Sequence, residues 1–166
     1  MAWGCSPFKD LAKPENNMLS NNQDAPRTAY PFLPIPFLEL LGVQRESVAG
    51  GKARISLELQ PQFRNLYDGF HGGVIMTLLD VAMASAAVSR NDFRHTVVTI
   101  DISVSFLSPA NGRVIAEAEA TGGGRSICFC EGRVIDASGA LVAKALGTFK
   151  YLKLADGNAA VRLVEA

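Results

Sequence analysis

One segment constrains the fold of this chain more than any other, the stretch from Gly72 to about Ser89. After its second residue it contains neither glycine nor proline, and apolar residues recur at helical spacing, at Val74, Leu78 and Val81. This pattern predicts a helix with hardly a polar face, and such a helix must be buried. A chain of 166 residues is long enough to form one domain whose core covers that helix.

Segments with strand periodicity surround this helix, since apolar and polar residues alternate along them. One precedes the helix and four follow it: 53–59, then 98–106, 114–120, 127–135 and 141–151. A short helix is expected at 36–41, between a proline and a glycine. These elements predict an α+β fold in which a curved antiparallel sheet wraps around one long central helix. A long edge strand and uncovered helix surface favour pairing with a second copy of the chain.

The two ends of the chain differ from its middle. Six of the eight prolines lie in the first 36 residues, among several asparagines, a composition typical of a loosely ordered arm. We therefore expect an arm at 1–36, a folded domain at 37–152 and a tail at 153–166. The arm has neither the apolar stretch of a secretory signal nor the many cations of a transit peptide. We expect a cytoplasmic protein.

Charge and cysteine content exclude several classes of protein. Sixteen basic and sixteen acidic side chains give no general attraction for nucleic acid or for an anionic membrane. No uninterrupted apolar run approaches the ~20 residues that span a bilayer. Cys5, Cys128 and Cys130 are too few for a disulfide framework. Cys128 and Cys130 lack a partnering histidine motif, so we expect small apolar residues on one strand face and no metal site.

The segment from Asn65 to Asp80 has the residues best suited to chemistry. Gly72 and Gly73 are expected to begin the long helix, where free backbone N–H groups and the helix dipole can polarise a carbonyl oxygen. His71 and Asn65 are polar side chains that can orient one another beside the glycines. Asp80 is a carboxylate among apolar neighbours, so it must be paired, protonated or functional.

Each of these residues also has a purely structural interpretation. His71 can cap the helix or anchor the loop, and Asn65 can be an ordinary turn residue. The two glycines can permit close packing of the helix on the sheet. Asp80 can make a hydrogen bond between subunits and nothing more. Their combination in one segment is what favours a catalytic site.

The spacing of Gly72 and Asp80 indicates how such a site would be assembled. Eight residues at ~1.5 Å each separate the two by ~12 Å along a helix. An acid that far along cannot reach a carbonyl held at the start of its own helix. If both groups serve one reaction, the acid comes from a second copy of the helix, packed antiparallel about a dyad. A dimer would then contain two equivalent, shared sites.

Several motifs together resemble those of the hotdog-fold acyl-CoA thioesterases. They are Asn65, His71-Gly72-Gly73, Leu79-Asp80 and Phe106-Leu107-Ser108-Pro109-Ala110. The resemblance is greatest to the phenylacetate-pathway (PaaI-type) branch of the 4-hydroxybenzoyl-CoA thioesterase superfamily, and it covers roughly 37–151. It implies a hotdog fold assembled as dimers or as a dimer of dimers, a homotetramer. It also implies hydrolysis of acyl-CoA to free acid and CoA without a metal or redox cofactor.

The resemblance implies roles for five catalytic residues. The Gly72 N–H would polarise the thioester carbonyl, while His71 steadies Asn65 and Asn65 places substrate or water. Asp80 of the facing subunit would be the nucleophile or general base. Thr99 would position water, although the alternation along its strand puts it on a polar face with Asp101, Ser103 and Ser105, which can equally be solvated or form a second interface.

Further residues are candidates for substrate binding. Gly73 lies beside the carbonyl site, and Tyr67 and Phe70 either wall the acyl pocket or pack the loop. Arg125 and Ser126 are candidates for the CoA nucleotide, although Arg125 can also be a solvated turn residue. A non-catalytic acyl-CoA sensor or scaffold on the same fold is the main alternative function. An enoyl-thioester hydratase is a second one, but the Asp and His motif of those enzymes is absent from the sequence.

Overall fold

The computed structural model describes residues 35–153, so most of the predicted arm and tail lies outside the described residues. In chain order its elements are α1 (Pro36–Leu41), β1 (Gln44–Ala49), β2 (Lys52–Glu58), the 3-10 helix η1 (Pro61–Phe63), α2 (Gly72–Arg90), β3 (His95–Phe106), β4 (Arg113–Gly123), β5 (Ile127–Asp136) and β6 (Leu141–Lys153). Both predicted helices and all five predicted strands are present.

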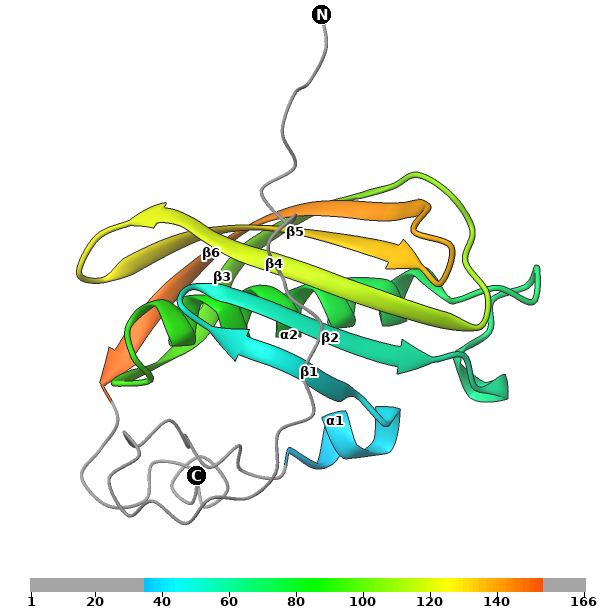
Figure 1. The fold of residues 1–166 in the computed structure, drawn as a ribbon, viewed down its shortest axis with the longest axis horizontal. Helices are drawn as coiled ribbons and strands as arrows, with labels where there is room; N and C mark the ends of the chain where they lie inside the picture. Colours follow the sequence, from blue (N-terminus) through cyan, green and yellow to red (C-terminus); the bar gives the residue numbers. More distant parts are fainter. Residues whose placement is uncertain (1–34, 154–166) are drawn as a thin grey trace, which may run out of the picture.

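The six strands form one antiparallel sheet in the order β1-β2-β4-β5-β6-β3. The sheet curves around α2, which lies along its concave side (Figure 1). This confirms the predicted architecture of one long helix wrapped by an antiparallel sheet. β1 and β3 are the two edge strands.

β1 was not among the strands predicted from the sequence. Residues 44–47 are exposed, so the alternation of buried apolar residues that marks the other strands is absent there. The signal that could have revealed it is the pair Gly50-Gly51, with φ angles of 57° and 82°. Left-handed backbone at both positions is typical of a two-residue hairpin turn, and the flanking Ala49 and Lys52 are paired across it.

One face of α2 forms the centre of the core. Its buried residues are Ile75, Leu78, Leu79, Ala82, Met83, Ala86, Ala87 and Ser89. Gly132 of β5 allows the helix to approach the sheet closely, because a Cβ there would lie 3.2 Å from the Leu79 and Met83 side chains. By length and mean hydropathy, 1.6, α2 could also cross a membrane, which a count of uninterrupted apolar residues overlooks. In the fold one face of the helix packs against the sheet, and 44% of this window is buried.

A bulge in β3 corrects the predicted orientation of Thr99. Thr99 lies opposite the fully buried Phe149, and the next paired residue is Asp101, so Ile100 has no partner in β6. The extra residue reverses the alternation. Thr99 therefore lies on the helix side of the sheet, although it is itself exposed, whereas Val98 and Ile100 lie on the other side and are 45% and 56% exposed. The expectation that Thr99 shares a face with Asp101 is wrong, because it assumed an unbroken strand.

The convex side of the sheet has a ladder of ion pairs. Glu117 of β4 is only 3% exposed and lies between Arg54 of β2 and Arg133 of β5. Arg54 donates a hydrogen bond to its carboxylate, and the Nε and Nη2 of Arg133 lie 2.8 and 2.7 Å from the Glu117 Oε2. Arg54 also donates to Glu46 of β1 at 2.6 Å. The buried carboxylate thereby connects three central strands through their side chains.

Candidate active site

Asn65 organises the loop that leads into α2. Its Oδ1 accepts hydrogen bonds from the backbone N–H groups of Tyr67 and Gly69, at 2.8 and 3.2 Å. Its Nδ2 donates to the Phe70 carbonyl at 3.0 Å. The structural interpretation of Asn65 as a turn residue is therefore correct. An amide has two N–H donors, so one remains for another partner.

His71 is the N-cap of α2. Its Nδ1 accepts a hydrogen bond from the Gly73 N–H at 3.0 Å, and its carbonyl accepts from Val74 and Ile75 at 3.0 and 3.3 Å. The side chains of His71 and Asn65 thus bond to backbone and not to each other. No direct hydrogen bond by which His71 would steady Asn65 is present among the described residues, since the His71 Nδ1 caps the helix.

These bonds leave one amide of the first turn open. Gly73, Val74 and Ile75 all donate within the chain, whereas the Gly72 N–H has no acceptor among the described residues. A Cβ on Gly72 would meet the Phe106 ring at 3.5 Å, an ordinary contact, and a Cβ on Gly73 would crowd the His71 Nδ1 at 3.2 Å. Gly72 therefore presents a free donor, and Gly73 makes room for the cap.

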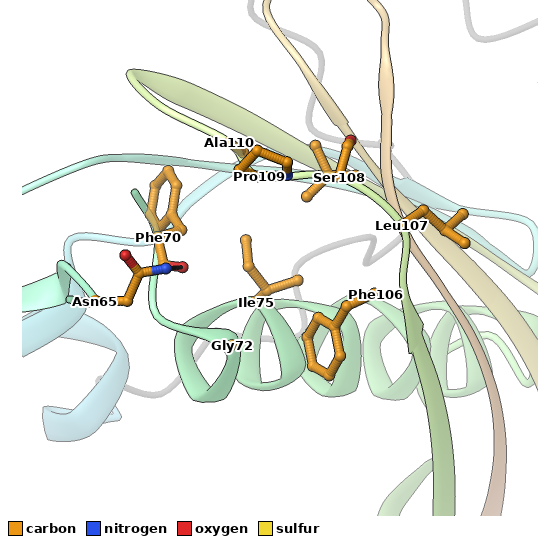
Figure 2. Close-up of a pocket in the computed structure, with 10 residues that line it drawn as sticks. Asn65, Phe70, Gly72, Ile75, Phe106, Leu107, Ser108, Pro109 and Ala110 are labelled. Atoms are coloured by element: carbon orange, nitrogen blue, oxygen red, sulfur yellow. Dashed lines mark hydrogen bonds between the residues drawn. The ribbon is translucent and has the colours of Figure 1, made fainter. Parts of the chain in front are cut away.

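The Gly72 amide lies beside a cavity of about 360 Å³. Its wall comes from Asn65, Phe70, Gly72 and Ile75, from the end of β3 and the loop at 106–110, and from Val142 of β6. Figure 2 shows Phe70 and Phe106 on either side of Ile75, with Asn65 and Gly72 at one end. Apart from Asn65, Phe70 and Gly72, sequence reasoning assigned no binding role to these wall residues, although an alternating strand that ends in Ser-Pro-Ala was a usable signal.

Asp80 and Thr99 form a second, separate polar group. The Thr99 hydroxyl donates to the Asp80 carboxylate at 2.7 Å. The bulge in β3 makes this bond possible, because it turns Thr99 toward the helix. Asp80 lies eight residues beyond Gly72 in a continuous helix and is not among the residues that line the cavity.

The other predicted binding residues lie in different places. Phe70 is 5% exposed and forms part of the cavity wall, whereas Tyr67 is 85% exposed. Arg125 and Ser126 are exposed in the turn between β4 and β5, at the opposite end of the fold from the start of α2 (Figure 1). A single chain therefore brings Asn65, Phe70 and Gly72 together and keeps Arg125 and Ser126 apart from them.

The two described cysteines pack as predicted, as small apolar residues on one face of β5. Cys128 and Cys130 are both buried and their Sγ atoms are 3.8 Å apart. Burial, together with the neighbouring Cys128, raises the pKa of the Cys130 thiol, which makes it unreactive. Within residues 35–153 no three histidine, cysteine or acidic side chains cluster closely enough to hold a metal ion.

A curved antiparallel sheet around one helix, with a free amide at the helix start, defines a protein of the hotdog class. Comparison with known proteins gives the family. Residues 69–143 match the family described as "Thioesterase superfamily". The chain is 31% identical over 127 residues to "Putative esterase VNG_1336C" of Halobacterium salinarum, covering 70% of this chain and 84% of the relative. It belongs to the thioesterase superfamily.

Solved structures agree with this assignment. The conserved protein PA5202 of Pseudomonas aeruginosa has a TM-score of 0.69 and 30% identity, covering 72% of this chain and 96% of that one. A mutant of the phenylacetic acid degradation protein PaaI of Thermus thermophilus has a TM-score of 0.65 and 28% identity, covering 71% and 100%. The predicted hotdog fold and likeness to the PaaI branch are confirmed, and hydrolysis of thioesters or esters is the activity that the family supports.

Proposed function

We propose that the protein hydrolyses an acyl-CoA thioester to a free acid and CoA, at sites shared between two copies of the chain. The observation that carries the proposal is the separation of two complementary groups within one chain. The free Gly72 amide lies at a cavity, and the Asp80–Thr99 pair lies two helical turns further along α2.

The surface of α2 supports the sharing of sites. The residues that the sheet leaves at least partly exposed include Met76, Thr77, Asp80, Ala84 and Val88, and the only charged residues of α2 are Asp80 and Arg90, the latter at its last position. A solvated helix face normally has many charges, so this one is suited to contact with another protein surface. Two such helices packed antiparallel bring the Asp80 of each copy to the Gly72 end of the other, because the two-fold axis repeats every contact.

The chemistry follows from this arrangement. The thioester carbonyl oxygen accepts a hydrogen bond from the Gly72 N–H, at the positive end of the helix dipole. In one route Asp80 takes a proton from water as the water oxygen attacks the carbonyl carbon. In the other, Asp80 attacks directly and water hydrolyses the resulting mixed anhydride. In both routes the C–S bond breaks and the CoA thiolate leaves and gains a proton.

The remaining polar residues have supporting roles in the proposal. Thr99 holds the Asp80 carboxylate in place through its hydrogen bond. Asn65 lies at the same end of the cavity as Gly72 (Figure 2), and its second N–H can bind the substrate. Arg125, which makes no hydrogen bond or ion pair within the described part of the chain, is proposed with Ser126 to contact the CoA phosphates.

Thiol release from a panel of acyl-CoA esters tests the proposal. The variant Asp80→Asn is expected to lower kcat by at least about 1000-fold while binding of the ester persists. Asp92→Asn is the matched control, since Asp92 is exposed in the turn after α2. Equal turnover in both variants would remove Asp80 from the mechanism. Binding of esters without any thiol release would instead identify a non-catalytic acyl-CoA-binding protein.

A further inference from the structure

The dipeptide Asn111-Gly112 lies in the loop between β3 and β4, and both of its residues are exposed. Among the described residues, neither the Asn111 side chain nor the Gly112 N–H has a hydrogen-bond partner. The side-chain amide and the backbone nitrogen that follows it are therefore both free to react with one another.

An asparagine in this situation loses its side-chain amide without an enzyme, and asparagine is among the thermolabile residue types. The Gly112 nitrogen attacks the Asn111 Cγ, the Cγ–Nδ2 bond breaks, and ammonia leaves with the proton that the Gly112 nitrogen gives up. Water then opens the resulting succinimide ring at one of its two carbonyls, which leaves an aspartyl or an isoaspartyl residue. Glycine favours the attack because it has no Cβ to obstruct the approach.

A second dipeptide within the described residues, Asp68-Gly69, shows how such a site is protected. Asp68 is also exposed, and an aspartate can form the same ring by loss of water. However, the Gly69 N–H donates to the Asn65 Oδ1 at 3.2 Å, and the Asp68 carboxylate lies 3.4 Å from the Arg64 Nη1. Both reacting groups are occupied there, whereas both are free at Asn111.

The backbone is anchored on both sides of Asn111. The Ala110 carbonyl accepts a hydrogen bond from the Phe70 N–H at 2.9 Å, and the Gly112 carbonyl accepts one from the Leu59 N–H at 2.8 Å. Ala110 and Phe70 also line the cavity at the start of α2 (Figure 2). An isoaspartyl residue adds one carbon atom to the main chain between the two anchors, so at least one of these hydrogen bonds is strained and the cavity wall shifts.

Both products also place a negative charge near Asn65. The Asn111 Oδ1 and the Asn65 Nδ2 lie 3.7 and 3.8 Å from the point that a Cβ on Gly69 would occupy. A carboxylate in this position opposes the negative charge that develops on the thioester oxygen at the same end of the cavity. Near a protein surface, a unit charge about 8 Å from another changes a rate roughly tenfold.

We propose that Asn111 is a site of spontaneous deamidation, and that its conversion to an aspartyl or isoaspartyl residue slows the neighbouring active site as the protein ages. The effect on turnover rests on the proposed thioesterase function, whereas the modification itself does not. Pairing of two copies through the edge strand β3 leaves the site exposed, because β5 and β6 lie between β3 and β4, and β4 begins directly after Gly112.

Ageing of the full chain in mildly alkaline buffer tests the modification. Peptide mapping by mass spectrometry should show a gain of about one dalton, from NH2 to OH, in the peptide that contains Asn111, and an isoaspartyl methyltransferase should label the same peptide. Asn91 is the internal control, because its Nδ2 lies 2.8 Å from the His95 Nδ1, and it should stay unchanged over the same period. Asp68 should accumulate no isoaspartate.

The variant Asn111→Gln is the matched control for this experiment. Its longer side chain would have to close a six-membered ring, so the mass gain should be absent from this peptide. An Asn111 that stays intact, or one that converts no faster than Asn91, would overturn the proposal.

The consequence for the site is tested with the variant Asn111→Asp and with aged protein. Asn111→Asp should slow thiol release from acyl-CoA roughly tenfold, and the difference should shrink at high salt, whereas Asn111→Gln should keep its rate before and after ageing. In aged wild-type protein, thiol release should fall in step with the converted fraction, and hydrogen exchange at the Phe70 and Leu59 N–H groups should become faster. Unchanged turnover and unchanged exchange after full conversion would refute the coupling.

The two sets of measurements separate this inference from the proposed reaction. Conversion of Asn111 with faster exchange at Phe70, but without thiol release from fresh protein, would refute the proposed hydrolysis and leave the modification site in place. Thiol release from a protein in which Asn111 stays intact on ageing would support hydrolysis and refute the modification site.

Discussion

Replacing Gly72 by proline tests the free amide on its own. The substitution removes the N–H that we place on the thioester carbonyl, and the backbone accommodates it. Gly72 is the first residue of α2, where proline is favoured, and His71 before it has φ −66° and ψ 135°, the extended conformation that proline requires of its predecessor. Gly72→Ala retains the N–H and adds a Cβ in ordinary contact with Phe106, so it controls for bulk in the cavity.

The expected loss follows from the chemistry of oxyanion stabilisation. Removing one donor to a developing oxyanion costs about 2.7–4 kcal/mol, or about 100- to 1000-fold in kcat. Thiol release should therefore be about 100-fold or more slower in Gly72→Pro than in Gly72→Ala, with circular dichroism and melting temperature showing that both are folded. If the two folded variants differ by less than about threefold, the Gly72 N–H does not stabilise the transition state.

Three further predictions concern Thr99, Glu117 and Cys130. Thr99→Val removes one hydrogen bond to a carboxylate, worth about 1.5–3 kcal/mol, so kcat/KM should fall about 10- to 100-fold. Thr99→Ser retains a hydroxyl and should restore most of the activity. An unchanged rate in the valine variant would contradict the positioning role of Thr99. Glu117→Gln leaves two arginines without their buried carboxylate, so urea titrations should show a free energy of unfolding lower by about 3 kcal/mol. A change below about 0.5 kcal/mol, typical of a surface substitution, would show that the ladder of ion pairs contributes little to stability. Burial raises the pKa of the Cys130 thiol, so above the unfolded thiol pKa of about 8.5 the unfolded state loses a proton that the folded state keeps. The free energy of unfolding should therefore fall as the pH rises above about 8.5, with a slope that approaches about 1.4 kcal/mol per pH unit near pH 10. In Cys130→Ala the difference in bound protons between the unfolded and folded states should be smaller by one, and the slope should fall accordingly. An identical slope in both proteins would refute the raised pKa of Cys130.

The sequence was a sound guide where one local pattern decides the structure. α2 and five strands follow from helical and alternating periodicity, because each buries a single face against the same core. β1 gave no such signal, because it is an edge strand whose residues at 44–47 are exposed. The orientation of Thr99 could not be predicted, since a bulge depends on the register with β6 and leaves no mark in the residue pattern.

The candidate site shows a similar limit. The free amide at Gly72 follows from the glycines at a helix start, and the separation of Asp80 follows from helix geometry alone. The hydrogen bonds of His71 and Asn65 required the structure, because each side chain had several backbone partners within reach. The cavity wall combines segments near residues 70, 108 and 142, and only the three-dimensional fold brings these together.

Mixing two inactive variants tests the shared site most directly. In a dimer of one Gly72→Pro chain and one Asp80→Asn chain, one site has both defects and the other has neither, because each site takes its amide and its acid from different copies. Equal co-expression should therefore restore about a quarter of wild-type thiol release, since half of the dimers are mixed and each has one intact site. If the mixture is no more active than its two parents, the amide and the acid of a single chain serve the same site, and a site shared between two copies is contradicted.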